Sequence, residues 1–316
     1  MENALWVFNS VLPILIFLWI GHLLRKRSFF SPETIDNIKN FIVNFTLPAV
    51  LFTSFLDIAF RWNYLLLMIL VFLLCVFLYL YGRSTKQIFR QSWIYFPFLL
   101  TGFEFGMLGL SLFGSAYGLE NFGKMAILGV PHEFFIWFVY VTLLVRETST
   151  KPSVGSLLKS FLSSPVIIAI FASILLNLSG WAAWLNNAFF ADGLFKVLNL
   201  LAGLTAPLIL LVVGYDIKIT PTNIKSSVLV VLLRLGLLIP LALLINRFIL
   251  SALLNLDRGF QIAFFTLVIL PPPFIIPIFM KKGLAEEKAF ITNTLMLHTV
   301  ASIVTFIIYF ALNPSL

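Results

Sequence analysis

One acidic residue interrupts a long apolar stretch of the chain. Glu104 lies in the sequence LLTGFEFGMLGLS, residues 99–111, which also contains three glycines. A charged side chain at the centre of a membrane helix costs about 2.5 to 3.5 kcal/mol, so such residues usually mark an ion pathway or a binding site. A carboxyl group here could carry a proton, or bind a cation or an amino group. The structural alternative is that Glu104 pairs with Arg234 or with a backbone donor.

Four prolines form a second candidate site in another apolar stretch. Pro271, Pro272 and Pro273 are consecutive, and Pro277 follows them. Proline lacks an N–H group, so three in a row cannot continue a helix, and the carbonyl groups that they free need other partners or water. The run predicts an interruption within a membrane-crossing segment. The structural alternatives are a kink or a short loop.

Small and polar residues complete the two candidate regions. Gly106 and Gly109 would permit an unusual backbone beside Glu104, because glycine tolerates conformations and close contacts that other residues do not. Ser111 places a hydroxyl group in the same stretch. His298 lies in the middle of the last apolar stretch, where it could exchange a proton or donate to a neighbouring helix.

Further candidates lie in other apolar stretches. Pro48 and Pro207 each follow a threonine by two residues, and each could take part in a site or act as a kink. Asn44 could contact the solute or bridge two helices. His132 and Glu133 are adjacent, so we expect them to point in different directions from their helix and to lie nearer the outer interface.

Composition identifies the solvent of this chain as a lipid bilayer. Hydrophobic residues make up 60% of the sequence and charged residues 11%. Apolar runs of about 20 residues recur along it, which is the length that a membrane helix needs. We expect an all-α membrane protein with ten transmembrane helices, near residues 5–24, 37–56, 63–82, 93–113, 124–145, 161–179, 194–214, 226–247, 260–280 and 288–312.

The basic residues orient these spans. Of the 21 Lys and Arg residues, fifteen lie in loops on one side of the predicted membrane and five on the other. Cytoplasmic loops carry an excess of Lys and Arg, so both termini should lie outside a cytoplasmic membrane, which we expect to be bacterial. Arg234 lies inside the eighth span, close enough to its cytoplasmic end for the side chain to reach the interface.

The order of the unusual segments predicts an internal repeat. Pro48 and Pro207 occur in the second and seventh spans, and each precedes an interrupted segment two spans later. Five spans in each half would make the second half enter the membrane from the opposite side. Paired interrupted helices in such inverted repeats mark a binding site at the membrane midplane in many secondary transporters. We expect halves of 1–150 and 151–316, joined within the polar stretch 146–153.

Other classes of function have weak support. His132 and Glu133 begin a zinc-protease motif, but residue 136 is isoleucine where the second histidine is required. Cys75 is the only cysteine, which excludes an intramolecular disulfide and a metal site made of several thiolates. Basic residues occur singly or in short clusters, so no nucleic-acid surface is implied. We expect no enzyme, cofactor or metal, and the partners to be a small-molecule solute and the lipid bilayer.

Four segments give the chain a family resemblance. They are IGHLLRKR at 20–27, FIVNFTLPAVLF at 41–52, GMLG with LFG at 106–114, and PIFMKKG at 277–283. In this order they resemble the auxin efflux carrier family, which includes plant PIN-type carriers and bacterial permeases. The resemblance implies two inverted five-helix repeats, with helices 4 and 9 broken where they cross. It also implies a scaffold of spans 1, 2, 6 and 7 that carries a homodimer surface, and transport of small organic anions.

Two positions depart from the family pattern. The fourth helix of the family usually carries an asparagine followed some residues later by Gly-Ile-Pro, and the aligned positions here are Glu104 and Ser111. The main functional hypothesis is alternating-access efflux of a small organic carboxylate. Glu104 motivates the alternative, a proton-coupled or cation-coupled carrier of a cationic or amino-bearing solute. A transporter-like sensor without flux is a further alternative.

Overall fold

The computed structural model describes a chain that is helical almost throughout. The described residues are 2–56, 61–88, 93–147, 155, 159, 162–218, 221, 223–281 and 283–315, and no strand occurs within these ranges. Most of the expected join between halves, including Lys151 and the boundary at residue 150, lies outside the described residues. So do Arg90 and Lys282, which belong to the basic side of the charge count.

The helices follow one another with short connections. In chain order they are α1 (Glu2–Lys26), α2 (Pro32–Phe41), η1 (Ile42–Thr46), α3 (Leu47–Leu56), α4 (Trp62–Ile88), α5 (Phe96–Leu99), η2 (Phe105–Gly109), α6 (Leu110–Tyr117), η3 (Leu119–Asn121), α7 (Phe122–Phe135), η4 (Ile136–Tyr140), α8 (Val141–Arg146), α10 (Pro165–Leu178), α11 (Trp181–Asn186), α12 (Ala191–Asp216), α13 (Ile224–Ile245), η5 (Asn246–Leu253), α14 (Arg258–Ile269), α15 (Ile276–Phe279) and α16 (Ala285–Leu312).

Six helical segments in the described part of the chain are long and apolar enough to cross a membrane. They are Pro32–Leu56, Trp62–Gln87, Phe122–Arg146, Ala191–Asp216, Ile224–Leu253 and Ala285–Leu312. Several of them expose large apolar side chains, such as Leu66, Leu73 and Leu80 at seven-residue intervals on α4. Such a stripe suits a lipid environment. Together with the six long apolar helices, it identifies the chain as a multi-pass membrane protein of the all-α class.

Four of the ten predicted spans are not among these six segments. The stretches 93–113, 161–179 and 260–280 overlap the shorter apolar helices Phe105–Tyr117, Pro165–Leu178 and Arg258–Ile269. The first predicted span, 5–24, lies within α1. Within the described residues the structure therefore shows six candidate spans, and the expected number of ten stays a prediction.

One group of helices is held together by a close backbone contact. This first helix group comprises α1, α2, α3, α10 and α12, in which α1 packs on α12 and α3 packs on both α10 and α12. A Cβ added at Gly21 of α1 would collide with the Leu211 carbonyl oxygen of α12, and one at Gly214 would collide with the Leu18 backbone. Glycine at both positions therefore lets the two helices touch. These helices cover the spans that the family resemblance assigns to a scaffold.

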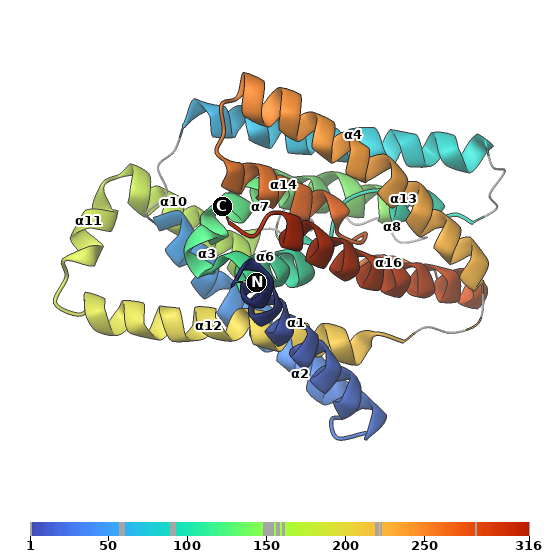
Figure 1. Ribbon diagram of the computed structural model, residues 1–316, viewed down its shortest axis with the longest axis horizontal. Coiled ribbons are helices and arrows are strands. Elements are labelled where there is room, and N and C mark those ends of the chain that lie inside the picture. The colour runs from blue at the N-terminus through green and yellow to red at the C-terminus, as the bar shows by residue number, and fades with distance from the viewer. Residues whose placement is uncertain are drawn as a thin grey trace.

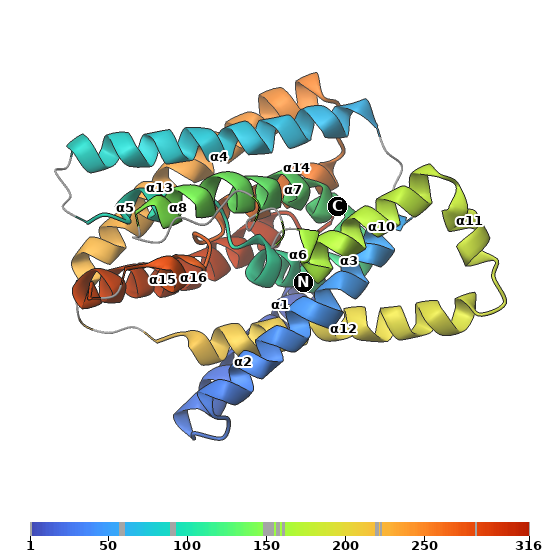
Figure 2. The ribbon, with the colours of Figure 1, turned by 180° about the vertical axis from the view of Figure 1, so that it is seen from behind.

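The remaining long helices form a second helix group. It comprises α4, α7, α13, α14 and α16, with the short helices α5, α6, α8 and α15 between them. Figures 1 and 2 both show α12 on the opposite side of the molecule from α4. The helices α6 and α7 also contact the first helix group, so they lie between the two.

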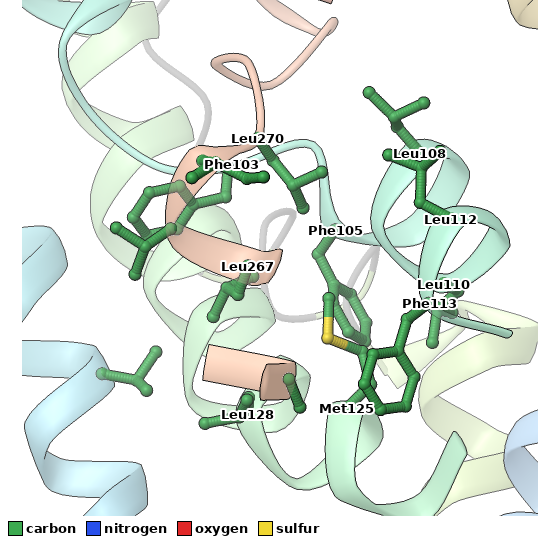
Figure 3. Close-up of a cluster of buried hydrophobic side chains, with 14 of the residues drawn as sticks. Phe103, Phe105, Leu108, Leu110, Leu112, Phe113, Met125, Leu128, Leu267 and Leu270 are labelled. Atoms are coloured by element: carbon green, nitrogen blue, oxygen red, sulfur yellow. The ribbon is translucent and has the colours of Figure 1, made fainter. Parts of the chain in front are cut away.

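An apolar cluster fills the centre of the second helix group. Figure 3 shows Phe103 and Phe105 in this cluster with Met125 of α7 and with Leu267 and Leu270 from the end of α14. All five side chains are at most 3% exposed. The cluster therefore fixes the segment that precedes α6 against α7 and α14, which positions the site described next.

Candidate functional site

The chain leaves its helical conformation beside Glu104. The short helix α5 ends at Leu99 and η2 begins at Phe105, so residues 100–104 form a first interruption. Gly102 has a φ of 67°, which lies in the left-handed region that glycine adopts without a steric penalty. The glycine therefore permits the chain to turn between the two helices.

A second interruption lies at the proline run. Helix α14 ends at Ile269 and α15 begins at Ile276, and residues 270–275 between them are not helical. Pro271, Pro272 and Pro273 are all buried. Their missing N–H groups explain why the helix cannot continue. Pro277 lies in the first turn of α15, a position where proline is tolerated.

Glu104 joins the two interruptions. Its backbone N–H donates to the Pro271 carbonyl oxygen at 2.8 Å. Its side-chain Oε2 accepts from the Phe274 N–H at 2.8 Å, and Oε1 accepts from the Met107 N–H at 3.4 Å. The carboxylate thus caps the start of η2 with one oxygen and accepts a hydrogen bond from the second interruption with the other. This is the backbone-donor role that the sequence offered as the alternative to pairing with Arg234.

Arg234 of α13 supports both interruptions from another direction. Its guanidinium donates to the carbonyl oxygens of Leu99 at 3.2 Å and Leu270 at 3.3 Å, and also to that of Gly102. The side chain is 1% exposed, and its guanidinium carbon lies 5.3 Å from the centroid of the Phe103 ring. Arg234 therefore does not reach the interface, contrary to the expectation. It satisfies carbonyl groups that the interruptions remove from helical hydrogen bonding.

His132 and Glu133 also lie at this site. The Phe103 N–H donates to His132 Nε2 at 2.9 Å, so in the neutral ring the proton is on Nδ1. Glu133 Oε1 is 3.5 Å from that Nδ1 atom. The two side chains therefore do not point apart, and the histidine, which is 1% exposed, holds the first interruption. Their position near the outer interface stays a prediction.

A cavity of about 220 Å³ lies between the two helix groups, and we call it the site cavity. On one side the lining residues come from η1 and α3 and from the start of α10: Val43, Leu47, Leu51, Ser164 and Val166. The remaining lining residues are Phe103, Glu104, Phe105, Gly106, Met107, Leu110, His132, Glu133, Ile136, Trp137, Pro273 and Ile275. Glu104 and Glu133 are its two carboxylates, and no Lys or Arg is among these described lining residues. The lining is otherwise mainly apolar.

Several predicted site residues reach the site cavity or the interruptions. Gly106 and Pro273 line the cavity beside Glu104, and Pro272 lies in the second interruption. His298 Nδ1 is 3.0 Å from Ser302 Oγ, and that hydroxyl donates to the Ile269 carbonyl oxygen at 2.6 Å. His298 therefore supports the end of α14 through a serine, and it does not line the site cavity.

Other predicted site residues lie elsewhere and do not line the site cavity. Ser111 donates to the carbonyl oxygen of Met107 at 2.6 Å, and Asn44 donates to that of Asn40 at 2.7 Å, so each binds its own helix. A Cβ at Gly109 would lie 2.7 Å from Leu270 Cδ1, which makes this glycine a packing residue. The helical prolines at positions 48 and 207 lie within α3 and α12.

Sequence reasoning missed the residues that the first helix group contributes. Val43, Leu47 and Leu51 follow one another at intervals of four, which places them on one helix face. Nothing in their type distinguishes that face from a lipid-facing one, so their spacing was the only signal. Trp137 of η4 was missed for the same reason.

Comparison with models of known protein families and with curated proteins found no match for this chain. The site cavity and its hydrogen bonds therefore carry the functional interpretation.

Proposed function

We propose that this protein is a secondary transporter of the auxin efflux carrier type, in which the site cavity holds a small solute. The observation that carries the proposal is the position of the cavity. Interrupted segments of the second helix group face α3 and the start of α10 across it. Movement of one group against the other would expose such a cavity to the two sides of the membrane in turn.

The two interruptions are the crossing point of this transporter. Two contacts support the crossing: the Glu104 N–H donates to the Pro271 carbonyl oxygen, and the Phe274 N–H donates to the Glu104 carboxylate. Each half of the chain then contributes one broken helix to an inverted repeat of ten spans, and the first helix group is the scaffold and homodimer surface. Non-helical backbone at membrane depth requires such protein contacts or a solvated cavity.

The orientation of the proposed transporter follows from its charges. Both termini face outward, and the ends of helices that carry most of the Lys and Arg residues face the cytoplasm. Single cysteines that replace Lys218 and Lys196, at opposite ends of α12, test this orientation in a Cys75→Ser background. An impermeant thiol reagent should label position 196 in intact cells and position 218 only after lysis. The reverse pattern would contradict the orientation.

The lining of the site cavity favours a solute with a positive charge. Two carboxylates face the cavity and no basic side chain balances them among its described lining residues. An ammonium group would therefore be attracted, whereas a carboxylate would be repelled unless the acidic groups were protonated. Phe103, Phe105 and Trp137 supply an apolar surface for the rest of the solute. Such a site fits a small amine that carries an aromatic or aliphatic body.

Glu104 is the coupling group in this proposal. Its carboxylate can bind a proton or the ammonium group of the solute, but one negative charge neutralises only one of them. Competition at one carboxylate links solute binding to proton release. The same carboxylate accepts from Phe274, so its state of charge also affects the contact between the two interruptions.

One observation supports a second candidate, the organic carboxylate that the family resemblance implies. The backbone N–H groups of Met107 and Phe274 converge on the Glu104 carboxylate. If Glu104 were protonated and displaced, these donors would be free for the carboxylate of a solute. The anion therefore stays a prediction, to be tested beside the amine.

A pair of probes with opposite charge separates the two candidates. Phenethylammonium and 3-phenylpropionate have the same ring and similar chain lengths, and their binding to the purified protein is measured by calorimetry. Counterflow of each probe is then measured in proteoliposomes. We expect binding and counterflow of the ammonium probe only. Binding and counterflow of the carboxylate alone would favour the second candidate, and binding of either probe without counterflow would favour a sensor.

A further inference from the structure

A second cavity lies at the end of α1 and α12, far in the sequence from the interruptions. We call it the end cavity, and its volume is about 530 Å³. It is lined by His22, Arg25 and Lys26 of α1 and by Ile217 and Lys218, which follow α12. Figure 1 shows these two helices crossing in the first helix group. The polar lining residues are all basic, and no acidic residue lines the cavity in the described part of the chain.

The acidic groups nearest in sequence are engaged elsewhere. Asp216 Oδ2 lies 2.9 Å from Lys39 Nζ on α2, and Asp36 Oδ1 lies 3.3 Å from the same nitrogen. Within the described residues, no ion pair involves Arg25, Lys26 or Lys218. Asp216 also interacts electrostatically with Arg25, but its ion pair is with Lys39, so the end cavity retains a net positive charge.

One of these charges is held in a fixed position. Arg25 Nη1 donates to the carbonyl oxygens of Tyr215 at 3.0 Å and Asp216 at 3.4 Å. The guanidinium carbon lies 5.8 Å from the centroid of the Tyr215 ring, and the Tyr215 hydroxyl donates to the Phe30 carbonyl oxygen at 2.9 Å. A guanidinium has five N–H donors, so those on its other nitrogens remain for an anion.

The outer face of α1 indicates the source of that anion. Leu15, Trp19, His22 and Lys26 follow one another at intervals of three or four, so they share one helix face. Leu15 is 46% exposed and Trp19 61% exposed. An apolar stripe of this kind, which leads into a basic cavity, matches the acyl chains and the phosphate of a membrane lipid. A free phosphate would not require the stripe.

We propose that the end cavity binds the phosphate head group of an anionic phospholipid, with the acyl chains against the Leu15 and Trp19 face of α1. Basic pockets between membrane helices on the cytoplasmic side are suited to such head groups. The inference is independent of transport, because it uses no residue of the site cavity. Bound lipid would join α1 to the segment after α12 at the membrane surface.

A matched pair of double variants tests this site. Lys26→Gln with Lys218→Gln removes two charges from the end cavity and leaves Arg25 in place. Arg83→Gln with Lys86→Gln removes two charges from another cavity, which Glu147 also lines. Both variants are first checked for an unchanged melting temperature in neutral detergent, and an unfolded variant is replaced by its single substitutions.

Dioctanoyl-phosphatidylglycerol is titrated into each protein in neutral detergent, with dioctanoyl-phosphatidylcholine and inorganic phosphate as separate probes. We expect the end-cavity variant to bind phosphatidylglycerol about 30-fold more weakly than the parent, and the control variant within about threefold of it. Phosphatidylcholine and inorganic phosphate should bind much more weakly. Equal losses in the two variants would overturn the site. Binding of inorganic phosphate as tight as that of phosphatidylglycerol would overturn the lipid as its ligand.

Discussion

The site cavity and the end cavity have opposite charge but a common construction. In each, one charged side chain is anchored to the backbone of a second element: Glu104 accepts from Phe274, and Arg25 donates to Tyr215. The other charged groups, such as Glu133 and Lys26, line the cavity without hydrogen bonds to a second element among the described contacts. In each cavity the anchored charge maintains the shape of the site and can also bind the ligand, whereas the other charges add to the preference for a ligand of opposite charge.

The largest effect on stability is expected from Arg234, whose guanidinium is anchored to the carbonyl oxygens of both interruptions and does not line the site cavity. Arg234→Met would leave three carbonyl groups without their donor in a buried region. Each unsatisfied group costs about 1 to 3 kcal/mol, so the free energy of unfolding should fall by about 3 kcal/mol or more. Chemical denaturation in detergent measures it. Arg247→Met at an exposed position of η5 is the matched control, and an equal loss in that variant would contradict the role of Arg234.

The two carboxylates of the site cavity provide the next test. Glu104→Ala removes the acceptor of the Phe274 and Met107 N–H groups, so we expect a loss of about 2 kcal/mol in the free energy of unfolding. Glu133→Ala should change it by less than about 0.5 kcal/mol. Both are measured by the same denaturation experiment. If the two variants lost equal stability, anchoring would not distinguish these carboxylates.

A smaller effect is expected at the end cavity. Arg25→Gln removes the hydrogen bonds to the Tyr215 and Asp216 carbonyl oxygens and should lower the free energy of unfolding by about 1 kcal/mol. Lys26→Gln should leave it within about 0.5 kcal/mol of the parent protein. The measurement is made in zwitterionic detergent, so that anionic lipid does not contribute. A greater loss from the lysine than from the arginine would contradict the assignment of the anchored charge.

The features that could be predicted from the sequence are residue types that are rare within apolar membrane-spanning stretches. Three consecutive prolines indicated one interruption and the glycines beside Glu104 the other, because proline cannot continue a helix and glycine permits an unusual backbone. The acidic residue in an apolar stretch indicated the candidate site. Adjacent positions in the sequence did not predict that the side chains of His132 and Glu133 approach each other to 3.5 Å.

Two of the predicted site residues that do not line the site cavity have short polar side chains. Ser111 and Asn44 each donate to a carbonyl oxygen four residues earlier in their own helix. Serine and asparagine can satisfy themselves locally in this way, so their presence in an apolar stretch does not require a ligand. Glu104 differs because its carboxylate has no donor group and must accept hydrogen bonds from elsewhere.

The central claim is that Glu104 binds the solute or carries its coupling proton. Its most direct test is exchange of phenethylammonium by proteoliposomes at several pH values, with the parent protein, Glu104→Gln, and Glu286→Gln as a control at an exposed position. We expect Glu104→Gln either to lower exchange at least about tenfold, as when one partner of a buried charge pair is lost, or to abolish the dependence of exchange on pH. The control should behave as the parent. If Glu104→Gln left both the exchange rate and its pH dependence unchanged in a parent protein that transports the probe, the central claim would be wrong.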